Sequence, residues 1–339
     1  MMSARIKLLR NNNDSELLNN NTNTTTTTIS DYRYIKLIIL LSCQIISILC
    51  SLFIFVNIIH QPSKFIKPIG NHFIFVLLIT SFIQVTTELS MVESYLRTGI
   101  VQPSNNSYCL FFNWYEFSLN GISLFVMFWA TIERHILIFT RSIYHIRWKC
   151  IVFHYLPLSI ATLYTPIFYG YVIFIYNCVN TWDYYELLCT SPCFYQNKIL
   201  GSIDWLMNII IPAFSIVLVN LILIIRVTCR SISVRITIQR KKKNRKMTVQ
   251  LLVISSLFLI FWLPIAITGL IQQYFSPTFL IDIQFNIFFY LIYLIQLFLP
   301  FVCLISLPEL KKEIRVKLHK WRRRNLIIDG ASLQMATIG

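Results

Sequence analysis

Ionisable side chains inside apolar stretches are the residues of this chain whose types and spacing point to chemistry. Glu88, Glu116 and Asp204 each lie in an apolar run, and the triplet Glu133-Arg134-His135 ends another. Such residues are costly in apolar spans, so they usually face a protein interior or a water-filled cavity. The sequence shows no nucleophile–base set and no metal-ligand spacing. We therefore expect binding or switching rather than an enzyme, with no cofactor and no metal.

The elements that must position these residues are long apolar runs. The chain has 339 residues, of which 56% are hydrophobic and 13% are charged, whereas soluble domains carry about 25% charged residues. Seven runs are long enough for membrane-spanning helices: roughly 35–59, 72–96, 109–139, 151–176, 201–225, 247–272 and 283–306. The sequence predicts an all-α membrane protein, a seven-transmembrane helix bundle over residues 34–308.

The basic residues predict the orientation of this bundle. The net charge is +16, and Lys and Arg residues cluster after the first, third, fifth and seventh runs, whereas the opposite loops contain only Arg97 and Lys198. By the positive-inside rule, the N-terminus lies outside and the C-terminus lies in the cytoplasm. The charge is therefore interpreted as a topology and membrane-lipid signal, and not as a nucleic-acid-binding surface.

The two ends of the chain differ in composition. Residues 1–33 are rich in Asn and Thr, which predicts a disordered extracellular tail. Residues 309–339 begin with a basic segment that also carries apolar residues, which predicts a cytoplasmic amphipathic helix and tail. Four Asn-x-Ser/Thr sequons lie on the predicted outer side, at Asn13, Asn20, Asn23 and Asn105, and are candidate glycosylation sites.

Three sequence anchors resemble one family. Cys109 lies about one membrane thickness before Glu133-Arg134-His135 in the third run, the sixth run carries Phe261-Trp262-Leu263-Pro264, and the seventh carries Pro300. This pattern resembles the rhodopsin-like (class A) G protein-coupled receptors over roughly residues 34–321. The chain departs from the family at Ser81, Leu299 and Cys303, which makes it a divergent member and puts sodium modulation at Ser81 in doubt.

The resemblance implies a set of switch residues near the inner face. In the family the acid of the triplet holds the arginine in the inactive state, and the arginine meets the G protein in the active state. These roles are carried onto Glu133, Arg134, Trp262, Pro264 and Pro300, with Thr248 as a further acceptor for the arginine. The bland alternative is an interfacial ion pair and a large core aromatic residue.

The resemblance also implies a ligand site in the outer half of the bundle. Glu116 falls where amine receptors of the family keep a ligand-binding acid, and Tyr293 falls where a tyrosine often bonds that acid. Asp204 and Glu88 are expected to face the same cavity, where their charge would attract cations. In the alternative interpretation, Glu116 is bonded to Tyr293 or Asn120 and serves packing alone.

Four cysteines lie on the predicted outer side: Cys109, and Cys178, Cys189 and Cys193 in the loop after the fourth run. Extracellular exposure favours disulfides, and four cysteines allow three pairings. In the family a bridge joins the third span to this loop. The resemblance therefore implies Cys109–Cys189, with Cys193 as the alternative partner.

The expected function is that of a plasma-membrane receptor that binds an extracellular ligand and signals through a heterotrimeric G protein. The acids fit a basic or amidated peptide, such as a neuropeptide, and also a small amine. A transporter or channel is the alternative from another class, because intramembrane acids also serve ion passage. No internal repeat between the two halves supports that alternative.

Overall fold

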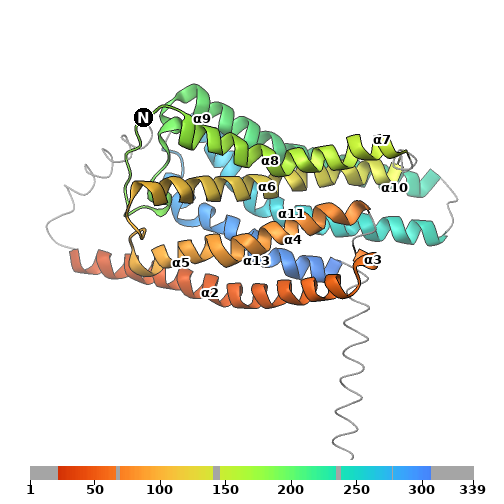
Figure 1. The fold of residues 1–339 in the computed structure, drawn as a ribbon, viewed down its shortest axis with the longest axis horizontal. Coiled ribbons are helices and arrows are strands. Elements are labelled where there is room, and N and C mark those ends of the chain that lie inside the picture. Colours follow the sequence, from red (N-terminus) through yellow and green to blue (C-terminus); the bar gives the residue numbers. More distant parts are fainter. Residues whose placement is uncertain (1–21, 66–68, 140–145, 234–237, 277, 307–339) are drawn as a thin grey trace, which may run out of the picture.

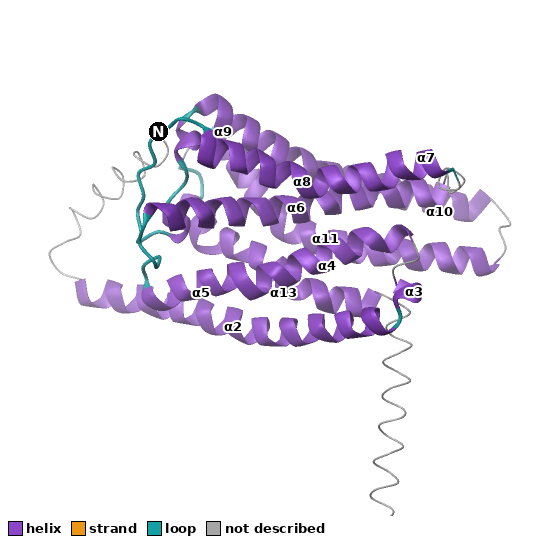
Figure 2. Cartoon of the chain, viewed as in Figure 1, coloured by secondary structure: helices purple, strands orange, loops and turns teal. Residues whose placement is uncertain are grey.

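Long helices lying side by side make up the computed structural model, which describes residues 22–65, 69–139, 146–233, 238–276 and 278–306 (Figure 1). The side chains of residues 22–31 and 227–248 lie outside this description, as does the predicted amphipathic segment after residue 306, apart from the exposed Val at position 249. Every regular element in the described ranges is helical, and Figure 2 shows loops joining helices at the end of the bundle near α9. The predicted all-α class is confirmed.

Six helical segments are long and apolar enough to cross a membrane: Tyr32–His60, Ile69–Thr98, Arg147–Ile175, Lys198–Arg226, Leu252–Tyr274 and Ile281–Ile305. Each overlaps one of the predicted runs. The third predicted run, 109–139, forms the helix α6 (Asn106–Phe139), which has 34 residues but is not one of the six. The six segments indicate a multi-pass membrane protein.

The remaining bounds follow the chain. The helices are α2 (Thr22–His60), α3 (Pro62–Phe65), α4 (His72–Ile83), α5 (Leu89–Thr98), α7 (Arg147–Cys150), α8 (Leu156–Gly170), α9 (Lys198–Asp204), α10 (Ile211–Ser233), α11 (Ile238–Tyr274), α12 (Ile281–Ile283) and α13 (Phe289–Ser306). Short 3-10 turns are η1 (Ile69–Asn71), η6 (Leu187–Cys189) and η7 (Cys193–Gln196).

Turns of π-helix interrupt several spans: η2 (Gln84–Glu88), η4 (Ile151–Tyr155), η5 (Tyr171–Ile175), η8 (Trp205–Ile210) and η9 (Gln284–Phe288). A π turn changes the register of a helix, so the residues beyond it face a different direction from the one that a continuous α-helix would give them. Several buried polar residues discussed below lie in these turns.

Helix α2 begins at Thr22, within the stretch 1–33 for which the composition predicted disorder. Thr and Asn are weak helix formers, but adding residues to an existing helix costs far less than nucleating a new one. The apolar span that follows can therefore carry the helix back into the Thr-rich stretch. Residues 1–21 lie outside the described residues.

Local signals start and stop the helices. The side chain of Asn105 accepts a hydrogen bond of 2.7 Å from the backbone N–H of Tyr108 before α6, and Asn197 caps α9 in the same way at 3.0 Å from Ile199. At the end of α5, Gly99 has φ of +76° and its N–H bonds to Tyr95 O at 2.7 Å. Glycine takes up this left-handed conformation at little cost.

Helix α6 lies at the centre of the arrangement and packs against α4, α8, α10 and α11. The main apolar core lies between these helices, α2 and α13, and includes Leu77, Met127, Phe258 and Trp262. Many large apolar side chains on α2, α8, α10 and α11 are instead exposed on the outside of the bundle. Such surfaces suit contact with lipid, where helix association depends on close packing rather than on the hydrophobic effect.

Candidate functional site

A buried carboxylate on α6 forms the centre of a polar network in the bundle. The hydroxyl of Tyr293, on α13, donates to Oε1 of Glu116 at 2.8 Å, and the side-chain amide of Asn120 donates to the same oxygen at 3.1 Å. Glu116 is buried, and no donor among the described residues reaches its other oxygen, Oε2. Tyr293 and Asn120 are the two partners that the sequence predicted for this acid.

Glu88, on the π turn η2, belongs to the same network and is fully buried. Its carboxylate accepts from the amide of Gln84 at 3.2 Å and from the amide of Asn120 at 3.4 Å. The Asn120 amide therefore lies between the carboxylates of Glu88 and Glu116. Two carboxylates so placed repel each other in a low-dielectric interior, which favours a cation beside them.

The network continues toward the inner half of the bundle. The Ser123 hydroxyl donates to Oε1 of Gln84 at 3.0 Å, and the Gln296 amide lies 3.4 Å from Ser123 Oγ. Ser81 then donates to the backbone carbonyl of Gln296 at 2.8 Å. Hydrogen bonds thus connect α4, η2, α6 and α13, and a buried network of this kind resists independent movement of its helices.

A tethered turn of the outer loop packs against α6 one turn before Glu116. A disulfide joins Cys109 to Cys189, and the Asn113 amide donates to the carbonyl of Leu188 at 2.7 Å. Leu188, Cys189 and Thr190 all have positive φ, of 61°, 56° and 77°. This left-handed backbone is strained for residues other than glycine, so the surrounding contacts must hold it in place.

A second disulfide joins Cys178 to Cys193, the residue that the sequence considered as an alternative partner of Cys109. The backbone N–H of Cys193 also donates to the side chain of Asn180 at 2.8 Å. The outer loop is therefore closed on itself as well as being bonded to α6. These restraints limit how far the loop can move away from the Glu116 network.

Asp204, at the end of α9, belongs to a separate network. Its carboxylate accepts from the hydroxyls of Tyr169 at 2.9 Å and Tyr195 at 2.5 Å, and from the Asn208 amide at 2.6 Å. The side chain is fully buried. This arrangement differs from the cavity shared with Glu116 that the sequence predicted, because two tyrosines and an asparagine surround the carboxylate and satisfy both of its oxygens.

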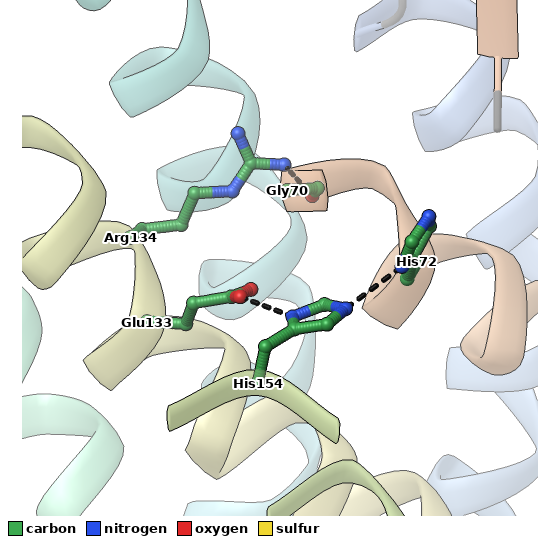
Figure 3. A network of polar contacts seen from close by, with 5 residues as sticks. All are labelled: Gly70, His72, Glu133, Arg134 and His154. Atoms are coloured by element: carbon green, nitrogen blue, oxygen red, sulfur yellow. Dashed lines mark hydrogen bonds and ion pairs between the residues drawn. The ribbon is translucent and has the colours of Figure 1, made fainter. Parts of the chain in front are cut away.

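At the inner end of α6, the neighbours Glu133 and Arg134 contact different parts of the bundle (Figure 3). Glu133 forms an ion pair with Nδ1 of His154, and the Arg134 guanidinium donates to the backbone carbonyl of Gly70. Both side chains are buried. This differs from the expectation that Glu133 holds Arg134, and the physical reason is that a closer partner, His154, engages the carboxylate.

Gly70 makes room for the arginine. A Cβ atom built at this position would lie 3.2 Å from Nη1 of Arg134 and 3.1 Å from Leu137. Most side-chain carbons do not approach other atoms so closely, so a larger residue would push against the guanidinium. The contact between Arg134 and the Gly70 carbonyl therefore depends on the missing side chain.

The other predicted switch residues lie on α11 and α13. Trp262 is buried in the main core, and its indole N–H has no hydrogen-bond partner among the described residues. Pro264 and Pro300 lie inside α11 and α13, and Thr268 donates to the carbonyl of Pro264 at 2.8 Å. Thr248 belongs to α11, but its side chain lies outside the described residues.

Of the four sequons, only Asn105 has a described side chain, and it is exposed at the start of α6. Asn23 lies in α2 with its side chain outside the description, and Asn13 and Asn20 fall outside the described residues. Exposure makes Asn105 accessible to a modifying enzyme.

Sequence reasoning missed several residues of these networks: Gln84, Asn113, His72, His154, Tyr169 and Tyr195. A usable signal was present for some of them, because amides and histidines inside apolar runs are unusual. The outer-loop Tyr195 carried no such signal.

The arrangement can hold a cation near Glu116 and Glu88, and it can change partners around Arg134. Within the ranges that the structure describes, no group of three or more His, Cys, Asp or Glu side chains could hold a metal ion. Comparison with protein-family models and with curated proteins gave no match to this chain.

Proposed function

We propose that this protein is a plasma-membrane receptor that passes an extracellular signal to a heterotrimeric G protein. In this proposal α6 is a seventh span that completes a seven-helix bundle, with the N-terminus outside and the C-terminus in the cytoplasm. Its lower apolarity fits a central position, because α6 packs against α4, α8, α10 and α11, which shield it from lipid.

The observation that carries the proposal is that α6 holds a functional group near each end. Glu116 has one carboxylate oxygen without a donor in the described structure, and Arg134, eighteen residues further along, is held by a backbone carbonyl. At about 1.5 Å per residue the two are separated by roughly 27 Å. A ligand at the first and a partner at the second would bind the same helix from opposite sides of the membrane.

The proposed ligand carries a cationic group that pairs with Glu116. Such a group would compete with the Tyr293 hydroxyl for the carboxylate and so alter the contact between α6 and α13. A ligand that binds one helix arrangement better than another shifts the population toward it. Pro264, inside α11, interrupts the backbone hydrogen bonding of its helix and offers a point of bending for the inner half.

A basic or amidated peptide is the first candidate ligand, because Asp183 and Glu186 lie in the outer loop near the tethered turn. A small amine is the second candidate. The burial of Asp204 among its own partners favours the amine, because it leaves the acids around Glu116 as the anionic centre. Membrane lipids would surround the exposed apolar faces in either case.

The test is a ligand screen on cells that express the protein, read out as nucleotide exchange, cyclic AMP and calcium. A tag at the N-terminus should be accessible on intact cells, and a tag at the C-terminus only after permeabilisation; the reverse pattern would reject the proposed orientation. Electrical recording without added G protein tests the channel alternative, and a ligand-gated current under those conditions would favour it.

Arg134→Ala gives the decisive variant once an agonist is known. It should abolish nucleotide exchange while leaving ligand binding measurable, because the guanidinium is the proposed contact with the G protein. Arg147→Ala is the matched control, since Arg147 is an exposed arginine at the same end of the bundle. Full exchange by a normally expressed Arg134→Ala would overturn the proposed role.

A further inference from the structure

Glu133 and Arg134 are adjacent in sequence, yet neither is the other's hydrogen-bonding partner in the described structure. The Glu133 carboxylate is paired with Nδ1 of His154, on the π turn η4, and the Arg134 guanidinium bonds to the Gly70 carbonyl in η1 (Figure 3). His154 is completely buried, and Glu133 is 1% exposed. The acid and the base are therefore held by two different segments that flank α6.

The direction of these hydrogen bonds follows from the chemistry of the groups. An ionised carboxylate only accepts, so Nδ1 of His154 must donate to Glu133. The other ring nitrogen, Nε2, lies 2.7 Å from Nδ1 of His72. When His154 is neutral, Nε2 is the acceptor and His72 donates to it, which fixes the tautomer that serves Glu133.

Aromatic neighbours hold the His154 ring in this orientation. Its centroid lies 4.9 Å from that of His72 and 5.4 Å from that of Phe73, with Phe73 approaching edge-on. Tyr155 packs against it from the next position, with ring centroids 4.8 Å apart. Rotation of His154 away from Glu133 would disturb all three contacts, so the donor is held in place before any partner binds.

Removing this donor would leave a buried carboxylate without a partner, which is costly. The nearest alternative on the same helix is the neighbouring guanidinium of Arg134, which would then have to leave the Gly70 carbonyl. His154 thereby decides which contact Arg134 makes.

We propose that His154, aligned by His72, is a positioning residue that keeps the Glu133 carboxylate away from Arg134. The consequence for stability follows from the contacts alone. The consequence for signalling rests on the proposed function, because Arg134 is then left on a single neutral acceptor from which a G protein can recruit it. In this protein the histidine, and not the acid alone, sets how readily the arginine is released.

The experiment is a double-mutant cycle on the purified full-length protein in lipid nanodiscs, with His154→Phe, Glu133→Gln and the two combined. Apparent Tm is measured for each, together with nucleotide exchange by a reconstituted heterotrimeric G protein. His154→Phe should lower Tm and slow exchange about tenfold, within the range usual for coupling between two sites. Adding Glu133→Gln should reverse both effects, because an amide neither requires a cation nor captures Arg134.

Conservative variants separate the two ring nitrogens. His154→Asn places an amide donor near the position of Nδ1 and should stay close to the wild type, whereas His154→Gln reaches toward the Nε2 position and should resemble His154→Phe. His60→Phe is the matched control, because His60 is an exposed histidine at the end of α2, and it should change neither measurement. If His154→Phe does not fold, the Asn and Gln variants carry the comparison.

The outcomes distinguish this inference from the proposed function. Additive losses of Tm in the double variant, or equal behaviour of the Asn and Gln variants, would overturn the positioning role. A wild-type protein that drives no exchange with any G protein would instead count against the proposed function, and the Tm cycle would still decide whether His154 positions Glu133. Reversal of the Tm loss and of the exchange loss by Glu133→Gln supports both.

Discussion

Tyr293 and Glu116 are joined by a hydrogen bond of 2.8 Å, although they lie 177 positions apart in the sequence. The bond ties α13 to α6 at a buried point, next to a carboxylate oxygen that has no donor in the described structure. A cationic ligand would meet Glu116 here and weaken its bond to Tyr293. This pair is therefore where ligand binding and a change in helix contacts coincide.

Substitution of Glu116 tests the charge directly. Glu116→Gln keeps the shape and a hydrogen-bonding group but removes the charge, and loss of a desolvated partner costs about 2–5 kcal/mol. At about 1.4 kcal/mol per tenfold, agonist potency should fall some thirty-fold or more. Concentration–response curves at matched surface expression measure this, and Glu116→Asp should lose less. An unchanged midpoint would show that the acid is structural.

Asp204 should affect stability more than ligand response. Each hydrogen bond to a buried charge contributes about 1.5–3 kcal/mol, so Tyr169→Phe should lower the apparent Tm by removing one donor to Asp204. Tyr171→Phe is the control, since Tyr171 is exposed on the same segment. Asp204→Asn should lower Tm while leaving agonist potency nearly unchanged. A potency loss as large as that of Glu116→Gln would place Asp204 in the ligand site after all.

The cysteines should fall into classes. Cys109→Ser removes the tether between α6 and the strained turn at Cys189, and should reduce surface expression or ligand response. Cys178→Ser should have a smaller effect, because the loop would keep its bond to α6. Cys303→Ser, at a buried free cysteine, is the control and should be mild. Flow cytometry and ligand binding measure these effects; equal behaviour of Cys109→Ser and Cys303→Ser would remove the argument.

Close packing between α6 and α8 can be tested at Gly121. A Cβ atom there would lie 2.6 Å from Cγ2 of Thr165, which is closer than real Cβ contacts, so the helices would have to move apart. Gly121→Ala should therefore destabilise the protein by about 1–3 kcal/mol, the usual cost of overpacking. Gly170→Ala is the control, because its nearest atom would be at an ordinary 3.6 Å. Equal melting temperatures for the two variants would contradict the close approach.

The sequence alone determined where the helices lie, because membrane spans must be long, apolar and internally hydrogen-bonded. Six of the predicted runs correspond to the six apolar segments, and the third forms α6. The pairing of Cys109 with Cys189 and the contact of Tyr293 with Glu116 followed from the family resemblance, and the structure places both pairs together.

Only the tertiary structure decided which polar groups meet. A continuous α-helical register cannot show that Gln84, Glu88 and His154 lie in π turns, where the facing of side chains changes. Asp204 carried the same sequence signal as Glu116, but Tyr195 from a distant loop and Tyr169 from α8 enclose it. His154 gave no sign of its partner, because the distance between η4 and α6 is set by packing across the bundle. Sequence patterns record the length and apolarity of each helix, whereas the choice of hydrogen-bond partner depends on how neighbouring helices rotate against one another.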